Sequence, residues 1–468
     1  MKKINLPYGP HSLTWTPPPG AAVKILCCNQ SPPVSDLEES VRCSFRQPIG
    51  SRPLRECVQP SDRVAVVVSD AARLFPQEKI LKLVLEEISH VDSARITIVI
   101  ANGNHEPSEP SRVGLGADLQ TAYRIVNHNS RAADAMRTVG HFPPKESFFF
   151  AKQAMKHLSR SARSAPASFI KVLRTALSGD LKTACRQIGY TPLGRALFIL
   201  GASFRATVRI NRAVADADIR ILIGQIKPHF LAGFSGGYKA VFPGCAHRTD
   251  IAMNHFMMNH PSVGLAVNDG NIIRDHIERA AKLCGKSFAV NVVMNHDRSV
   301  AGVFSGDPVR AQREGSALCR KIAAVKTEEA DVVISAEGYP EAVNLYQFTK
   351  VVPPAGRIVK PRGAIICAGS CGGGIGGMTV VNDITCKIGF RHMLPKGVRL
   401  YLVSDLPKNS VRKMEFTYAA TINEAISREK KRQKKDTLLI AVLAGAGLMV
   451  PDKTGARDAV RGARHTKK

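Results

Sequence analysis

Residues 63–105 read RVAVVVSDAARLFPQEKILKLVLEEISHVDSARITIVIANGNH, and this stretch decides the class of fold. The runs at 63–69 and 94–100 are short, apolar and rich in β-branched residues, which is typical of strands buried on both faces. Between them, residues 77–88 place apolar side chains three and four positions apart, which indicates a helix. A strand, a helix and a second strand in this order predict a parallel sheet and an α/β fold.

The same alternation continues along the chain. Further apolar strand runs lie at 219–223, 288–293, 330–334, 364–368, 400–403 and 438–442. At roughly 150 residues per domain, a chain of 468 residues holds two or three domains. We therefore expect two α/β domains, at 1–280 and 281–468, with mostly parallel sheets. The site is expected in a cleft between them, because ligands of such folds collect at the carboxyl ends of the strands.

The chain is strongly basic. It holds 66 Lys and Arg against 38 Asp and Glu, a net charge of +28. Much of the excess lies at 145–212, which we interpret as a basic helical insertion, and in a basic C-terminal tail. Such a balance favours an acidic partner. A small carboxylate or phosphate is the better prediction, because the basic stretches lack the aromatic interleaving of a nucleic-acid platform.

The cysteines and the apolar runs indicate the compartment. The eleven cysteines form no CxxC pair, which favours a reduced, intracellular setting over a disulfide or zinc scaffold. The first fifteen residues lack the apolar core of a signal peptide. The longest apolar run, 438–450, contains two glycines and is too short to cross a bilayer. We expect a cytoplasmic protein without a membrane span.

The densest group of chemically active residues lies at 225–244, QIKPHFLAGFSGGYKAVFPG. A strand run ends, His229 follows, and a turn at Ser235, Gly236 and Gly237 precedes Lys239. Glycines allow positive φ and close backbone approach, which suits a phosphate or planar cofactor held by main-chain N–H groups. Lys239 could neutralise a phosphate or, if desolvated, act as a nucleophile. The spacing is not that of a phosphate-binding P-loop.

Other polar residues stand where a cleft is expected. Asp70 and Arg73 come directly after the first strand run, and His105 follows the second. An arginine fork there could bind a carboxylate, and a histidine could move protons.

Two further positions come later in the chain. His255 lies in a helical stretch, and neutral imidazole is the commonest metal ligand among side chains. Gln347 and Lys350 are one helical turn apart and share a face. Taken singly, each of these signals is more often structural than functional.

Together the motifs resemble the nickel-dependent lactate racemase family over about 60–377. The similar pieces are SDAAR at 69–73, ANGNH at 101–105, PHFLAGFSGGYK at 228–239, His255 at its spacing from Lys239, and LYQFTK at 345–350. The five occur in the order and spacing of that family.

The resemblance implies a nickel-pincer nucleotide as cofactor and a role for each matching residue. The implied roles are catalysis by His105 and His229; covalent attachment of the nucleotide by Lys239, with Asp70 and the turn at Ser235, Gly236 and Gly237 beside it; nickel coordination by His255; and substrate binding by Arg73, Gln347 and Lys350. The implied reaction is racemisation or epimerisation of a 2-hydroxy acid by hydride transfer coupled to proton transfer. The 1–280 domain would bind the cofactor, and the 281–468 domain would contribute substrate contacts.

Two features bear on substrate and partners. Members acting on lactate place a tryptophan in the C-terminal domain, whereas Trp15 is the only tryptophan here. The basic stretch also lengthens the segment between His105 and His229. We expect a lactate-like or larger 2-hydroxy acid, such as a sugar acid or a dicarboxylate. Cofactor-maturation proteins and a homodimer are the partners expected, with no specific nucleic acid.

Three other interpretations stay open. A mononuclear metal hydrolase could use His229 and His255, although these motifs offer no carboxylate as third ligand. The chain could instead be a non-catalytic, basic nucleic-acid-binding protein. It could also be a family member that binds the cofactor without catalysis, although the two preserved histidines argue against this.

Overall fold

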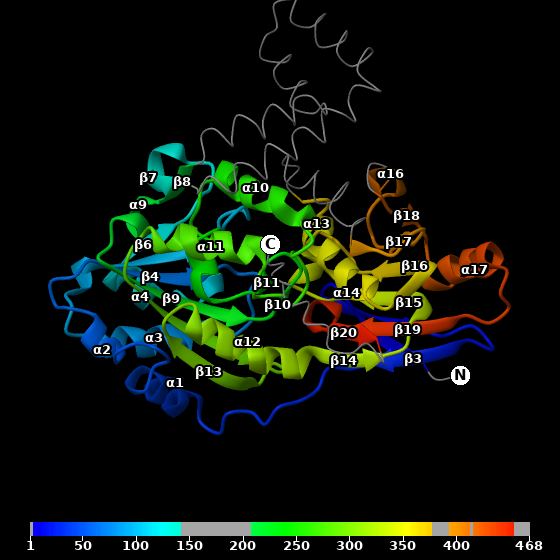
Figure 1. The fold of residues 1–468 in the computed structure, drawn as a ribbon, viewed down its shortest axis with the longest axis horizontal. Coiled ribbons are helices and arrows are strands. Elements are labelled where there is room, and N and C mark those ends of the chain that lie inside the picture. Colours follow the sequence, from blue (N-terminus) through cyan, green and yellow to red (C-terminus); the bar gives the residue numbers. More distant parts are fainter. Residues whose placement is uncertain (1–2, 142–206, 377–392, 412–414, 454–468) are drawn as a thin grey trace, which may run out of the picture.

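The computed structural model describes residues 3–141, 207–376, 393–411 and 415–453. Two six-stranded sheets lie side by side, each with helices packed against it (Figure 1). The first sheet has the order β13-β12-β9-β4-β5-β6 and is parallel except for β13. Its strands are β4 (Val64–Ser69), β5 (Ile96–Ala101), β6 (Arg124–Asn127), β9 (Ile219–Ile226), β12 (Ser287–Met294) and β13 (Val300–Gly306).

Helices cover both faces of the first sheet. On one face, the helices α1 (Leu37–Arg46) and α3 (Gln77–Glu87) form an apolar core with the sheet. On the opposite face, α10 (Arg248–Phe256) and α11 (Ile272–Lys282) form a second apolar core with it. All five residues from Val64 to Val68 are buried as a result. This double burial explains why the strand runs are continuously apolar rather than alternating.

The second sheet is entirely parallel, in the order β18-β17-β16-β15-β19-β3. Its strands are β3 (Ala22–Leu26), β15 (Ala330–Ala336), β16 (Val359–Ala368), β17 (Arg399–Val403), β18 (Thr417–Tyr418) and β19 (Leu439–Ala444). One face packs against α14 (Val352–Gly356). The other packs against α17 (Ile422–Gln433) and the hairpin of β1 (Ile4–Tyr8) and β2 (His11–Trp15).

Further helices and strands lie in the described part of the chain. They are α2 (Leu54–Cys57), α4 (Ala117–Ala122), β7 (Met136–His141), β8 (Thr207–Asn211), α9 (Arg212–Ala215), β10 (Pro228–His229), β11 (Gly233–Phe234), α12 (Arg310–Ala323), β14 (Ala324–Thr327), α13 (Leu345–Phe348), α16 (Lys408–Val411) and β20 (Val450–Lys453). Across the described ranges, no helix is long and apolar enough to cross a membrane.

The predicted fold class is confirmed. Each of the eight predicted strand runs is a strand, and the helix expected at 77–88 is α3. The strands near the N-terminus were not predicted from the sequence. The reason is visible in β3, where Leu26 alone is buried and the apolar signal is therefore weak.

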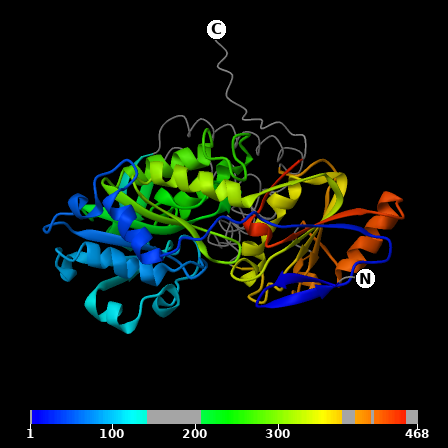
Figure 2. The same cartoon turned by 90° about the horizontal axis from the view of Figure 1, so that it is seen from below.

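The division at residue 280 does not hold. The strand β12 follows it but pairs with β9, and α12 packs against β12 and β13, so the first half continues to about residue 323. Conversely, β3 pairs with β19, and the β1–β2 hairpin lies with the second half (Figure 2). A parallel strand run looks the same whichever sheet it joins, because its pairing is decided by tertiary packing.

Most residues of the two basic stretches lie outside the residues that the structure describes. Of the helical insertion predicted at 145–212, residues 145–206 lie outside the described residues. Residues 207–211 form β8, which pairs with β7, so the end of that prediction is wrong. Residues 454–468 of the basic tail also lie outside the described residues.

Leu26→Ala tests whether β3 completes the second sheet. Leu26 is 4% exposed, so the substitution should lower the free energy of unfolding by about 2–5 kcal/mol, measured in urea. Its neighbour Ile25 is 46% exposed, and Ile25→Ala should change the same quantity by no more than about 0.5 kcal/mol. Equal stabilities of the two variants would contradict this packing.

Candidate active site

One cavity of about 140 Å³ lies at the carboxyl ends of the first sheet's central strands and faces the second half. All the predicted site residues line it: Asp70, Arg73, His105, His229, Ser235, Gly236, Gly237, Lys239, His255, Gln347 and Lys350. Asp70 follows β4, His105 follows β5, and His229 lies in β10 just beyond β9. Gln347 comes from α13 in the second half. Residues distant in sequence thus meet where the strands end, as in other α/β folds.

His105 is held at both ring nitrogens. Burial raises the pKa of Asp70, but His105, Arg73 and Lys350 outweigh it, so the pKa falls to about 2. Asp70 is therefore ionised and can only accept, and His105 Nδ1–H donates to it. The amide of Gln347 donates to His105 Nε2 from the other side. The Nε2 lone pair of His105 is thus an acceptor occupied by Gln347, and it can act as a general base when a substrate hydroxyl takes the place of that amide.

His229 has the opposite arrangement. Its Nδ1 accepts the backbone N–H groups of Leu231 and Ala232, at 3.2 and 3.1 Å. Burial, with the positive charges of Lys239 and Lys350, holds the pKa of His229 well below its usual value. The neutral ring therefore carries its proton on Nε2. The two histidines therefore hold opposite tautomers, in which Nε2 is an acceptor on His105 and an N–H donor on His229.

His255 is oriented by its own helix. Its Nδ1–H donates to the carbonyl of Ile251, one turn earlier in α10, at 2.8 Å. Burial, with Lys239 nearby, lowers the pKa of His255 to about 4. The ring is neutral and its Nε2 lone pair is free of this bond. A backbone carbonyl that fixes one nitrogen while the other stays basic is the usual arrangement of a metal-binding histidine.

Lys239 lies on a short 3-10 turn, Gly237–Ala240. Burial lowers the pKa of its amine well below the usual value, and the positive charges of Arg274 and Arg73 lower it further. A lowered pKa increases the fraction of the amine that is neutral, and the neutral form is the nucleophile. Lys239 is thus suited to covalent attachment of a ligand in the cavity.

The Ser235–Gly237 turn is held by the protein itself. Ser235 Oγ donates to the carbonyl of Gln225 at 2.6 Å and accepts the N–H of Lys227 at 2.8 Å. The N–H of Gly237 donates to Asn291 Oδ1 at 3.0 Å. The expected main-chain anion site is therefore not met at Gly237, because this N–H already has a partner. Gly236 has a φ of +82°, and a Cβ there would lie 2.8 Å from Asn291 Oδ1, so this glycine is required by packing.

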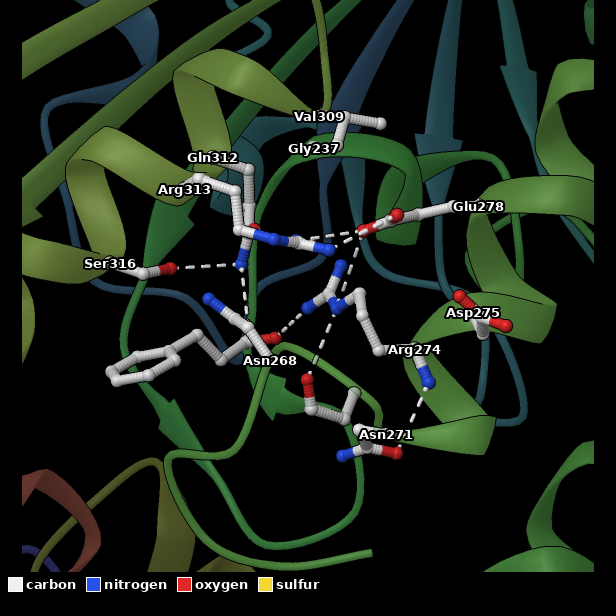
Figure 3. A network of polar contacts seen from close by, with 12 residues as sticks. Gly237, Asn268, Asn271, Arg274, Asp275, Glu278, Val309, Gln312, Arg313 and Ser316 are labelled. Carbon is white, nitrogen blue, oxygen red and sulfur yellow. Dashed lines mark hydrogen bonds and ion pairs between the residues drawn. The ribbon is translucent and has the colours of Figure 1, made fainter. Parts of the chain in front are cut away.

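A polar network that we did not predict from the sequence supports this loop from behind (Figure 3). Arg274 is 1% exposed and donates to the carbonyls of Ala232 and Phe234, both between His229 and Lys239. Gln312 Nε2 donates to the carbonyl of Ser235 at 3.2 Å. The sequence signal was a charged residue on the apolar face of α11, where Arg274 lies between Ile273 and Ile277.

The two halves are joined by ion pairs and hydrogen bonds around the cavity. Lys227 of the first half pairs with Glu341 of the second, and these side chains are 12% and 11% exposed. Lys350 Nζ donates to Gln347 Oε1, whose amide reaches His105. Burial, with Arg73 and Lys227, lowers the pKa of Lys350 to about 7.

The donor set limits how a metal could bind. Over the described ranges of the chain, no group of three or more His, Cys, Asp or Glu side chains is placed to hold a metal ion. The hydrolase hypothesis built on His229 and His255 thus gains no third protein ligand from this part of the chain.

Comparison with known sequences identifies the family. The model described as "Lactate racemase N-terminal domain" matches residues 8–159 and 193–266, and "Lactate racemase C-terminal domain" matches 325–396. Together they cover more than half of the chain. The chain belongs to the lactate racemase family. It is accordingly an isomerase of the racemase type. Residues 160–192, within the predicted insertion, match neither model.

Individual lactate racemases agree with this assignment. The lactate racemase of Thermoanaerobacterium thermosaccharolyticum is 27% identical over 385 residues, which cover 81% of this chain and 76% of that protein. The lactate racemase of Lactiplantibacillus plantarum is 26% identical over 450 residues, covering 88% and 91%.

Solved structures share the fold of this family member. The lactate racemase apoprotein of T. thermosaccharolyticum superposes with a TM-score of 0.72 at 23% identity, over 96% of this chain and all of that one. A Thermotoga maritima protein gives a TM-score of 0.61 at 16% identity, over 89% and 98%.

The lowered pKa of Lys239 can be measured by competitive acetylation of the apoprotein with acetic anhydride between pH 6 and 11. Acetic anhydride reacts only with the neutral amine, so labelling of Lys239 should rise at a pH well below that of added Nα-acetyl-lysine. Mass spectrometry measures the acetylated fraction of the Lys239 peptide and that of Nα-acetyl-lysine in the same sample. A labelling curve that coincides with that of the free amine would contradict the desolvated environment.

Proposed function

We propose that the chain interconverts the stereoisomers of a 2-hydroxy acid, lactate or a larger acid such as a sugar acid or dicarboxylate. The observation that carries the proposal is the pair of histidines fixed in opposite tautomers in one cavity. Cationic side chains line the same cavity, as a carboxylate substrate requires. The curated relatives are lactate racemases, which supports the same class of substrate.

Racemisation must break the α C–H bond beside a carboxylate. Loss of that hydrogen as a proton is unfavourable, because the carboxylate stabilises the carbanion poorly. Loss as a hydride leaves a flat 2-oxo acid once the hydroxyl proton also departs. Return of hydride and proton on the opposite face gives the other stereoisomer. The protein must therefore hold the carboxylate, receive and return one proton, and keep water out.

The two histidines match these proton tasks. His105 Nε2 can take the hydroxyl proton once the substrate hydroxyl replaces the Gln347 amide there, and the ionised Asp70 stabilises the resulting imidazolium. The Nε2–H of His229 can donate a hydrogen bond to the oxygen as it becomes a carbonyl, as neutral histidines do in other enzymes. The proton held by His105 returns to the carbonyl oxygen as the hydride returns to the opposite face, so the same two histidines serve both stereoisomers.

Arg73 and Lys350 are the groups suited to the substrate carboxylate. Arg73 Nε lies 3.9 Å from Asp70 Oδ1, beyond hydrogen-bond distance, so its guanidinium is not committed to that carboxylate. Lys350 is linked through Gln347 to His105. A carboxylate held there is thereby positioned relative to the base, and such positioning supplies a large share of catalysis.

The residues present fit a nickel-pincer nucleotide. Lys239 would hold it through its amine, whose pKa is lowered by burial, and His255 would give nickel its one protein ligand through Nε2. When bound, the group supplies a centre that accepts and returns hydride. The absence of a three-residue metal cluster among the described residues suits a metal whose other ligands belong to the nucleotide.

The proposed substrate extends beyond lactate because no tryptophan contributes to the site. Trp15 is 4% exposed in the core of the second half, where its Nε1 donates to Asn423. The cavity is lined instead by Tyr346 and Thr349 on the side of the second half. We expect this side to accept an acid larger than lactate.

Chiral chromatography of the loaded enzyme with D- and L-lactate, malate and gluconate tests the activity. His105→Gln and His229→Gln should each lower interconversion by about 10²–10⁴-fold, equally in both directions, because the two directions share one path. His247→Gln is the control, since this histidine caps α10 at Thr249 and does not line the cavity. Full activity in either site variant would remove that histidine from the mechanism.

Intact mass and metal analysis of protein matured in a cofactor-producing host test the cofactor. Wild type should carry an added sulfur-containing nucleotide and nickel. Lys239→Ala should lose the covalently added nucleotide. His255→Ala should keep the covalently added nucleotide but lose nickel, because the two residues hold different parts of the group. An unmodified wild type, from a host shown to load a known lactate racemase, would refute the cofactor assignment.

A further inference from the structure

Four small or short side chains form a row across the first sheet at the edge of the cavity. The register pairs Ser69 of β4 with Ala101 of β5, and Asn291 of β12 with Gly224 of β9. A Cβ on Gly224 would lie 3.8 Å from both Ser69 Oγ and Asn291 Oδ1, so these positions share one face. All four residues line the cavity. We call Ala101, Ser69, Gly224 and Asn291 the floor row.

Packing within the protein does not require the glycine of the floor row. At Gly236, Gly237 and Gly244, an added Cβ would lie 2.2–2.6 Å from its nearest neighbour. At Gly224 the nearest neighbours would be at 3.8 Å, an ordinary van der Waals separation. A side chain at 224 would therefore occupy the cavity rather than collide with the protein. A flat shelf of this kind suits a planar ring.

Asn291 provides an independent sign of a ligand. It is fully buried and interrupts the apolar run of β12. Its Oδ1 accepts the N–H of Gly237, which fixes the orientation of the amide, because a backbone N–H requires the oxygen. The remaining Nδ2 has no partner within the described part of the structure. Buried donors are almost always satisfied, so a donor left over beside a cavity points to an acceptor on a ligand.

We propose that the floor row is the shelf on which the pyridine ring of the cofactor lies, with Asn291 Nδ2 donating to a carboxylate-type oxygen on that ring. The inference rests on the proposed function, because it takes the ligand to be a pyridine mononucleotide. Asn291 also holds Gly237, two residues before Lys239. The same amide therefore positions the ring and the turn that carries the attaching lysine.

Asn291→Asp separates these two roles. Aspartate keeps an oxygen for the Gly237 N–H, but it replaces the free donor by a second acceptor. We would measure binding of nicotinate mononucleotide to the full-length apoprotein by calorimetry, with ribose 5-phosphate as a probe of phosphate binding alone. The melting temperature should stay close to that of wild type, while affinity for nicotinate mononucleotide falls at least tenfold and that for ribose 5-phosphate does not change.

Two variants accompany it. Asn295→Asp is the matched control, because Asn295 is also buried just past β12 but donates to the carbonyl of Ser31 and to Ser299 outside the cavity. It should bind the mononucleotide as wild type does. Gly224→Ala should fold normally and also bind the mononucleotide at least tenfold more weakly, which keeps the shelf testable if Asn291→Asp does not fold.

The outcomes separate the inference from the proposed function. Undiminished binding in both Asn291→Asp and Gly224→Ala would overturn the shelf, as would wild type that does not bind the mononucleotide at 1 mM. Equal loss of ribose 5-phosphate binding would assign Asn291 to the phosphate and overturn the ring contact. If wild type binds in the expected pattern but the loaded enzyme interconverts no 2-hydroxy acid, the shelf stands and the proposed function fails.

Discussion

A chain of polar contacts from Asp70 through His105 and Gln347 to Lys350 is the constraint on which the site depends. Its first two members belong to the first half of the molecule and its last two to the second. The charge on Asp70 fixes which nitrogen of His105 carries the proton, and Gln347 fixes where the other nitrogen points. The tautomer of the base is therefore set within the first half, whereas its Nε2 contact with Gln347 forms only when both halves meet. The Lys227–Glu341 ion pair holds that contact on the same side of the molecule.

Burial of like charges explains the chemistry of the remaining groups. Lys239, Lys350 and Arg73 converge on one cavity, and each raises the cost of a positive charge on its neighbours. Burial, together with these like charges, lowers the pKa values of Lys239 and Lys350 and keeps His229 and His255 neutral. The same excess of positive potential favours an anionic ligand. One electrostatic feature thus keeps the amine nucleophilic and the imidazoles unprotonated, and attracts a carboxylate.

The sequence was most informative where chemistry and strand ends coincide. His105, His229 and Lys239 follow recognisable strand runs, so their meeting in one cavity could be predicted. The family resemblance added Gln347 and Lys350, which spacing alone did not connect to the others. Asn291 and Arg274 were not predicted, because their roles depend on atoms of a loop that is distant in sequence. The domain boundary failed for the same reason, since the partner of a strand is a tertiary choice.

The placement of β3 has a consequence for the order of assembly during synthesis. Ala22 pairs with Leu439, so β3 leaves the ribosome long before the only strand beside which it lies in the second sheet. The first sheet, by contrast, has all its strands by residue 306. Its core can form while β3 still lacks its partner strand, and such long-range pairing is intrinsically slow. The second sheet therefore cannot be complete until residue 439 and beyond has been made, and the same half supplies Gln347 to His105.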